Sequence, residues 1–255
     1  MVFIALTREV GASIGRCELT HLSRQPIDLE RARAQHLAYE DALRRLGCQV
    51  IRLGDEPDMP DAVFVEDAAV VLDEVAVVTR PGASSRRAEG DSVAAGLSPH
   101  RRIRRIEDPG TVDGGDVLVI GRRIFVGLSS RTNREGAEQL ARLTGPFGYI
   151  LQPIPIGGCL HLKSAATAVG ERTLLINRSW VDAAAFDGYT LVDVDPAEPL
   201  GANALLIDQR LLYPASCPRT AERLDRLGLD VTRLDLSELA KAEGAMTCCS
   251  LVFRA

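Results

Sequence analysis

The chain has 255 residues, of which 46% are hydrophobic and 25% are charged, and these proportions exclude a disordered or fibrous protein. Its formal net charge of −5 argues against nucleic acid or an anionic membrane as a partner, because both select a basic surface. No run approaches the roughly 20 apolar residues that a membrane-spanning helix needs, and the N-terminal run is too short for a secretory signal. We therefore expect a cytoplasmic protein that is a monomer or homodimer.

The six cysteines are scattered without the spacing of a disulfide framework, which is typical of a reducing compartment. They are Cys17, Cys48, Cys159, Cys217, Cys248 and Cys249. The sequence contains no CxxC pair and no HExxH, so we expect no closed structural zinc site and no metal ligands.

Short apolar runs rich in valine and isoleucine recur along the whole chain, and their length and bounding Gly, Asp, Asn or Pro predict buried strands. These runs are Val2–Leu6, Gln49–Leu53, Ala62–Val65, Ala68–Leu72, Val75–Thr79, Val117–Ile120, Arg123–Val126, Tyr149–Ile154, Ala165–Val169, Thr173–Ile176, Ala204–Ile207, Arg210–Tyr213, Val231–Leu234 and Ser250–Phe253. Helices are predicted between them at Asp28–Gly47, Asn133–Leu143, Cys217–Gly228 and Ser237–Lys241, from their caps and apolar spacing.

Three pairs of these runs are joined by tight turns and predict hairpins at Val70–Val78, Val117–Gly127 and Leu205–Tyr213. The order hairpin, helix, strand recurs about every 50 residues, a period that indicates an internal repeat. No low-complexity linker divides the chain. We therefore predict an α/β fold in which residues 1–255 form one domain of several ββαβ units.

Two acids interrupt an apolar run in "PDAVFVEDAAVV", where Glu66 and Asp67 follow Asp61. A buried carboxylate is costly unless it meets a cation or several donors. The segment is therefore either a turn with solvated acids or a pocket for a cationic group. Among the arginines that follow, Arg86 and Arg131 could each grip a carboxylate with two parallel hydrogen bonds, although a solvated surface position is equally compatible with the pattern. The cluster at residues 101–105 is interpreted as surface.

Three further segments contain the side chains of a possible nucleophilic site. Asp113 and Asp116 flank a Gly-Gly pair that permits close backbone approach or positive φ, although an ordinary turn would explain it too. His161 follows another Gly-Gly turn and is the best candidate base, whereas a lone histidine is more often structural. Cys248 and Cys249 lie in "TCCS" near the end of the chain. A late cysteine, an isolated histidine and a glycine-flanked acid are the usual layout of a Cys-His-acid triad, while a buried structural cysteine needs no partner.

The ordered set "FVEDAAVV", "TRPGASSRR", "DGGDVL", "VGLSSRTN", "HLKS" and "GAMTCCS" closely resembles the dimethylarginine dimethylaminohydrolases (dimethylargininases), which belong to the arginine-modifying pentein superfamily. The resemblance runs from about Asp61 to the C-terminus. It implies an α/β-propeller of five ββαβ units around a pseudo-fivefold axis with a central active site. It also implies hydrolysis of a methylated arginine, a small-molecule substrate, to citrulline, with no cofactor.

The resemblance also assigns roles to residues. Cys248 would be the nucleophile with Cys249 as a neighbour, His161 the general acid and base, and Asp113 the orienting acid. The substrate-binding residues would be Asp61, Glu66, Asp67, Arg86 and Arg131, with backbone groups of Leu19 and Ala242 at the amino-acid end. Arginine deiminase, citrulline hydrolase and a non-catalytic amino-acid-binding pentein remain alternatives, because the relatives share the Cys-His-acid core.

Overall fold

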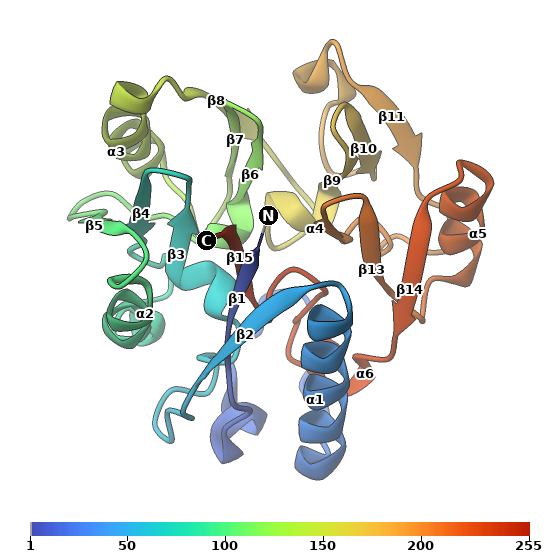
Figure 1. Cartoon of the computed structure of the whole chain (residues 1–255), viewed down its shortest axis with the longest axis horizontal. Helices are drawn as coiled ribbons and strands as arrows, with labels where there is room; N and C mark the ends of the chain where they lie inside the picture. The colour runs from blue at the N-terminus through green and yellow to red at the C-terminus, as the bar shows by residue number, and fades with distance from the viewer. Residues whose placement is uncertain (1) are drawn as a thin grey trace.

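A computed structural model describes residues 2–255, and Figure 1 shows small sheets arranged around a common centre with helices on the outside. The described residues form five sheets of three strands each. In every sheet the middle strand pairs antiparallel with one neighbour and parallel with the other. This common pairing pattern confirms the predicted repeat of a hairpin followed by a returning parallel strand.

The element bounds follow the chain in order. The strands are β1 (Phe3–Arg8), β2 (Cys48–Leu53), β3 (Ala69–Val71), β4 (Val75–Val78), β5 (Arg102–Arg105), β6 (Val117–Ile120), β7 (Arg123–Leu128), β8 (Ile150–Pro155), β9 (Ala166–Gly170), β10 (Thr173–Ile176), β11 (Thr190–Asp193), β12 (Leu205–Ile207), β13 (Arg210–Pro214), β14 (Asp230–Leu234) and β15 (Leu251–Arg254). The α-helices are α1 (Leu29–Arg45), α2 (Glu89–Leu97), α3 (Arg134–Thr144), α4 (Leu162–Ala165), α5 (Pro218–Arg226) and α6 (Ser237–Ala240).

Four repeats are continuous in the chain, and the two ends of the chain together build the fifth. The continuous ones are β3–β4–α2–β5, β6–β7–α3–β8, β9–β10–β11 and β12–β13–α5–β14, of which the third has the short 3₁₀ helix Ala183–Phe186 in place of an α-helix. The C-terminal strand β15 pairs antiparallel with β1, which pairs parallel with β2. The N-terminal and C-terminal strands therefore close the ring.

The structure corrects several sequence expectations. Residues 62–65 are a turn leading into the 3₁₀ helix Val65–Ala68 and not a strand, since the Ala62 and Phe64 amides donate to the Met59 and Asp61 carbonyls. The apolar side chains there are buried beneath the central cavity. Helix α2 and strand β11 were not predicted. The basic run at residues 101–105 lies at the surface, as expected, but it also forms the edge strand β5, which was not predicted; its exposed arginines are a common way to protect a sheet edge.

Short turns before the first strand of four of the five repeats bring polar side chains to the centre of the ring. The 3₁₀ helices Val65–Ala68 and Gly114–Asp116 precede β3 and β6, α4 precedes β9, and a turn containing Cys248 precedes β15. They are joined across the centre, because the Glu66 amide donates to the Cys248 carbonyl and the Gly115 amide donates to Asp67. In the part of the chain that the structure describes, no helix is long and apolar enough to span a membrane.

Candidate active site

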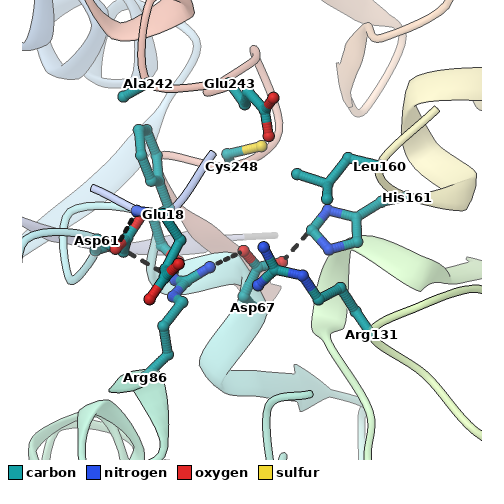
Figure 2. A pocket seen from close by; sticks show the side chains of 11 residues that line it. Glu18, Asp61, Asp67, Arg86, Arg131, Leu160, His161, Ala242, Glu243 and Cys248 are labelled. Carbon is teal, nitrogen blue, oxygen red and sulfur yellow. Dashed lines mark hydrogen bonds and ion pairs between the residues drawn. The ribbon is translucent and has the colours of Figure 1, made fainter. Parts of the chain in front are cut away.

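A cavity of about 20 Å³ lies where these turns meet (Figure 2). Its wall contains seven of the predicted site residues: Asp61, Asp67, Arg86, Arg131, His161, Ala242 and Cys248. It also contains four residues that the sequence did not point to: Glu18, Phe64, Leu160 and Glu243. Folding therefore brings side chains that are up to 230 residues apart, from Glu18 to Cys248, to one site.

His161 and Asp113 form a buried pair on one side of this cavity. Asp113 Oδ2 lies 3.1 Å from His161 Nε2, and Asp113 is fully buried behind the ring. The other Asp113 oxygen accepts a hydrogen bond from the Gly82 amide at 2.9 Å. Because Nε2 faces Asp113, Nδ1 is the ring nitrogen left to exchange a proton at the cavity.

The charges around His161 favour its protonated form. Burial lowers the pKa of the imidazole, but the charge of Asp67, the hydrogen bond to Asp113 and the charge of Asp116 together raise the pKa to about 9. The ring is therefore an imidazolium at neutral pH, and it can donate a proton to a group bound in the cavity.

Glycine is needed at positions 114 and 115 because neighbouring atoms lie too close for a side chain, and not because the backbone has a positive φ. A Cβ atom at Gly115 would lie 2.5 Å from His161 Nδ1, and one at Gly114 would lie 1.9 Å from the Glu66 carbonyl oxygen. No side chain fits at either position unless its neighbours move. The pair thus lets the Asp113 turn pack directly against the histidine and against the acidic turn at residues 66–67.

Cys248 lies in the turn before β15, and Figure 2 shows its sulfur and the His161 ring facing the same cavity. Burial raises the pKa of the Cys248 thiol well above its usual value, and the charges of Glu66 and Asp67 raise it further. Its neighbour Cys249 is fully buried in the hydrophobic core, does not line the cavity, and has a raised pKa because of burial. The two adjacent thiols therefore occupy different environments.

Asp67 and Arg86 form a second buried ion pair in the cavity wall. Arg86 Nη1 donates to Asp67 Oδ2 at 2.6 Å, and the guanidinium also makes two hydrogen bonds to Glu89, at 2.9 and 2.8 Å. Burial raises the pKa of Asp67, but the charges of His161 and Arg86 outweigh it and hold the pKa at about 2. Glu89 is 2% exposed and was missed from the sequence because its side chain belongs to the helix α2 that was not predicted.

Glu66 lies next to the cavity but outside its wall. Its two oxygens are engaged at 2.6 Å each, one by Lys163 Nζ and the other by the hydroxyl of Thr247, which directly precedes Cys248. Its direct contact with a guanidinium stays a prediction. Leu19 also lies outside the wall and packs on a hydrophobic cluster that contains the buried Ala242.

Asp61 and Arg131 complete the polar part of the cavity wall. Asp61 accepts two hydrogen bonds from the Glu18 amide, and burial raises its pKa. Arg131 donates to the Thr20 hydroxyl at 2.9 Å, and its Nη1 lies 3.9 Å from Asp113 Oδ2. The cavity wall thus combines carboxylates and guanidinium groups, as a site for a zwitterionic amino acid with a cationic side chain requires.

Ligand atoms of Asp67, Asp113 and His161 lie within 4.8 Å of one another, so this group has the geometry of a possible cation site. In the described residues, however, the same atoms already pair with Arg86, with backbone amides and with each other. These contacts account for the group as an ion-pair network.

Comparisons with known proteins agree with this geometry. The ring of five sheets is the pentein fold, since an arginine dihydrolase domain (ArgZ) from Cyanobacteria covers 99% of the chain, and the chain 97% of it, with a TM-score of 0.89 at 18% identity. The family model described as eukaryotic N,N dimethylarginine dimethylhydrolase matches residues 18–186.

Two proteins of that name are similar over almost the whole chain. The N(G),N(G)-dimethylarginine dimethylaminohydrolase of Streptomyces coelicolor is 39% identical over 98% of this chain and 96% of its own. The Pseudomonas aeruginosa protein, solved with citrulline as a cysteine-to-serine variant, superimposes with a TM-score of 0.94 at 32% identity and covers 99% of this chain and 100% of its own. The chain therefore belongs to the dimethylarginine dimethylaminohydrolase family.

Proposed function

We propose that the protein hydrolyses Nω,Nω-dimethyl-L-arginine and Nω-monomethyl-L-arginine to L-citrulline and dimethylamine or methylamine. The observation that supports this most strongly is the meeting of a thiol, an imidazolium and a carboxylate in one cavity, at Cys248, His161 and Asp67. The arginine dihydrolase structures share only the fold with this chain, whereas the dimethylarginine hydrolases share sequence over nearly all of it.

The substrate guanidinium is held against Asp67, and the amino-acid end is bound by the other charged groups of the cavity wall. The positive charges of Arg131 and Arg86 attract the substrate carboxylate, although the Arg86 guanidinium is also paired with Asp67 and Glu89. Asp61 and backbone groups of Leu19 and Ala242 interact with the ammonium group. Fixing the substrate at both of its ends places the guanidinium carbon near the sulfur of Cys248. This positioning removes much of the entropy cost of bringing the reacting atoms together.

The high pKa of the thiol has a direct consequence for catalysis. The resting thiol is neutral, because burial and the nearby acids oppose the thiolate. A bound guanidinium adds a positive charge between Asp67 and the sulfur; this charge lowers the thiol pKa, and the thiol proton is released to solvent because His161 is already protonated. The nucleophile is thus activated by the substrate, so that little reactive thiolate is present in the empty site.

Chemistry then proceeds through a covalent intermediate. The Cys248 thiolate forms a bond to the guanidinium carbon, and His161 gives its proton to the leaving nitrogen as the C–N bond breaks. The product amine departs, and an S-alkylthiouronium remains on the sulfur. The neutral imidazole next takes a proton from water, which attacks the same carbon and releases citrulline and the thiol. Asp113 stabilises the imidazolium in both halves of the cycle.

Product analysis with dimethylarginine, arginine and citrulline as separate substrates tests the proposal. We expect citrulline and dimethylamine from dimethylarginine, with far less ammonia released from arginine or citrulline. The Cys248→Ser variant should bind the substrate but lose turnover. The matched variant Cys249→Ser should keep its turnover. Undiminished turnover by Cys248→Ser would contradict the mechanism, and binding without turnover by the unmodified protein would indicate a non-catalytic amino-acid-binding protein.

A further inference from the structure

A second, much larger cavity adjoins the active site. Its volume is about 520 Å³, which lies within the range of ordinary small-molecule sites. We call it the side cavity; its apolar wall includes Leu22, Trp180, Leu200, Leu236 and Met246. The side cavity has two residues in common with the active-site cavity, Leu160 and Glu243.

The shared wall lies at the reacting end of the active site. Figure 2 shows Leu160 beside His161 and close to Cys248, whereas Asp61 lies on the other side of Asp67. A substrate whose guanidinium pairs with Asp67 and whose ammonium group interacts with Asp61 therefore directs its ω-nitrogen substituents toward Leu160. The side cavity begins behind that leucine.

Of the two shared residues, Glu243 is anchored and Leu160 is not. The Glu243 carboxylate accepts hydrogen bonds from the backbone amides of Thr20, His21 and Leu22, at 2.6–3.1 Å. Leu160 is only half-buried and its side chain has no polar anchor. A rotation of the Leu160 side chain is therefore the lowest-cost way to join the two cavities.

Trp180 forms a fixed part of the side-cavity wall. The Trp180 carbonyl accepts a hydrogen bond from the Gly157 amide at 3.0 Å, and the indole packs so tightly on Gly158 that a Cβ there would lie 2.8 Å from it. These contacts attach the indole to the loop that leads to Leu160 and His161. An apolar group that passes Leu160 would meet a pre-formed aromatic surface.

We infer that the active site also accepts Nω-substituted arginines whose substituent is an apolar group larger than methyl, such as propyl or benzyl, with that group extending past Leu160 into the side cavity. This inference rests on the proposed function and defines its substrate class more broadly. The bond changes are the same: the sulfur bonds to the guanidinium carbon, the bond to the substituted nitrogen breaks, and His161 gives that nitrogen its proton. The leaving group is a larger primary amine.

Charge complementarity supports the same path. A primary alkylamine is protonated at neutral pH once released, and the side cavity contains two carboxylates, those of Glu243 and Asp235. Glu243 accepts only from neutral backbone amides, whereas Asp235 is paired with Arg31 at 3.1 Å, so the negative charge of Glu243 is the one that can attract an ammonium group with an apolar tail. The side cavity thus suits both the bound substituent and the departing amine.

Citrulline release from dimethylarginine, Nω-propyl-arginine and Nω-benzyl-arginine tests the inference. We expect kcat/KM for the propyl and benzyl substrates to lie within about tenfold of the value for dimethylarginine. Ala240, which lines only the side cavity and is exposed, provides the discriminating variant. Ala240→Trp should reduce kcat/KM for the benzyl substrate at least tenfold and leave dimethylarginine unchanged.

Leu160→Ala gives an independent readout, which is the ratio of benzyl to dimethyl turnover in the same protein. The ratio should rise, because the barrier between the cavities is smaller. Good turnover of dimethylarginine with none of the propyl or benzyl substrate would overturn the inference and leave the proposed function intact. An equal effect of Ala240→Trp on both substrates would overturn it too, and no citrulline from any substrate would overturn the proposed function and this inference together.

Discussion

The carboxylate of Asp113 lies 3.1 Å from His161 Nε2 and is fully buried behind the imidazole. Asp113→Asn keeps the size of the side chain and removes its charge, so the imidazolium loses stabilisation. We expect kcat to fall by about 10²–10⁴, the usual contribution of a positioned acid–base group, with a smaller change in KM.

The same variant should lower the pKa of His161 from its value of about 9, because the hydrogen bond to Asp113 is one of the interactions that raise it. NMR titration of the His161 ring protons measures this directly. Asp187→Asn, at an exposed position, is the matched control and should change neither kcat nor the titration. A His161 pKa that stays at about 9 in Asp113→Asn would contradict this role.

The positions of the site residues explain why the sequence could predict most of them. Asp67, Asp113, His161 and Cys248 each occur within five residues before the first strand of a repeat, where polar letters interrupt an apolar pattern. These polar interruptions are visible in the sequence, and the resemblance of the ordered motifs to a known family assigns a chemical role to each residue. The hairpins and the repeat were equally visible, because they depend on local turn residues and alternating apolar runs.

The missed residues depend on long-range placement. Glu18 and Glu243 are acids in polar loops, and only the folded ring brings them to one cavity. Leu160 and Phe64 look like ordinary apolar residues, and nothing local marks them as part of a wall. Glu66 illustrates the converse case: a buried acid was one of the two alternatives that the pattern left open, and its partners Lys163 and Thr247 come from distant repeats.

Asp67 should have opposite effects on thiol reactivity and on turnover. Its charge helps to raise the pKa of the Cys248 thiol, so Asp67→Asn should increase the thiolate fraction and speed alkylation by neutral iodoacetamide at pH 7. Turnover should nevertheless fall at least about 10²-fold, because the guanidinium loses its charged partner. In the unmodified protein, alkylation should still be rising at pH 9, since the thiol pKa is well above its usual value.

The matched control for this experiment is Asp61→Asn. Asp61 lines the same cavity but is not among the groups that raise the Cys248 pKa. Its variant should alkylate at the unmodified rate and lose affinity for substrate. Slower alkylation of Asp67→Asn than of the unmodified protein would show that the electrostatic account of the thiol is incorrect.

The Gly115 position provides a steric test of the His161 geometry. A Cβ at Gly115 would lie 2.5 Å from His161 Nδ1 and 2.9 Å from Asp67 Oδ1, so Gly115→Ala should displace the ring and reduce kcat by at least about tenfold. Gly145→Ala is the control, because nothing lies within 4 Å of a Cβ there and the backbone φ of −53° suits alanine. Unchanged kcat in Gly115→Ala would mean that the ring is not fixed by this contact.

Asp116 connects the two loops that hold the acid–base and carboxylate-binding residues. One of its oxygens accepts a hydrogen bond from the Leu162 amide, next to His161, at 2.9 Å, and the other accepts from the Ser129 hydroxyl at 2.6 Å. The Ser129 oxygen in turn accepts from the Arg131 amide at 2.9 Å. Asp116→Ala should therefore lower kcat and raise KM together, and it should cost about 2–4 kcal/mol of unfolding free energy, since one buried and one partly buried hydrogen bond to the carboxylate are lost.

Asp116→Asn separates the hydrogen bonds from the charge. Its carbonyl can still accept from the Leu162 amide, so activity should lie between that of the alanine variant and the unmodified protein. Burial raises the pKa of Asp116 from 3.8 to about 6, so the folded state binds the proton more tightly than the unfolded state. The stability of the unmodified protein should consequently fall, relative to Asp116→Asn, as the pH rises from about 4 through 6. Urea unfolding of both proteins across that range measures the difference, and a pH-independent difference would show that Asp116 is not held in an unfavourable charged state.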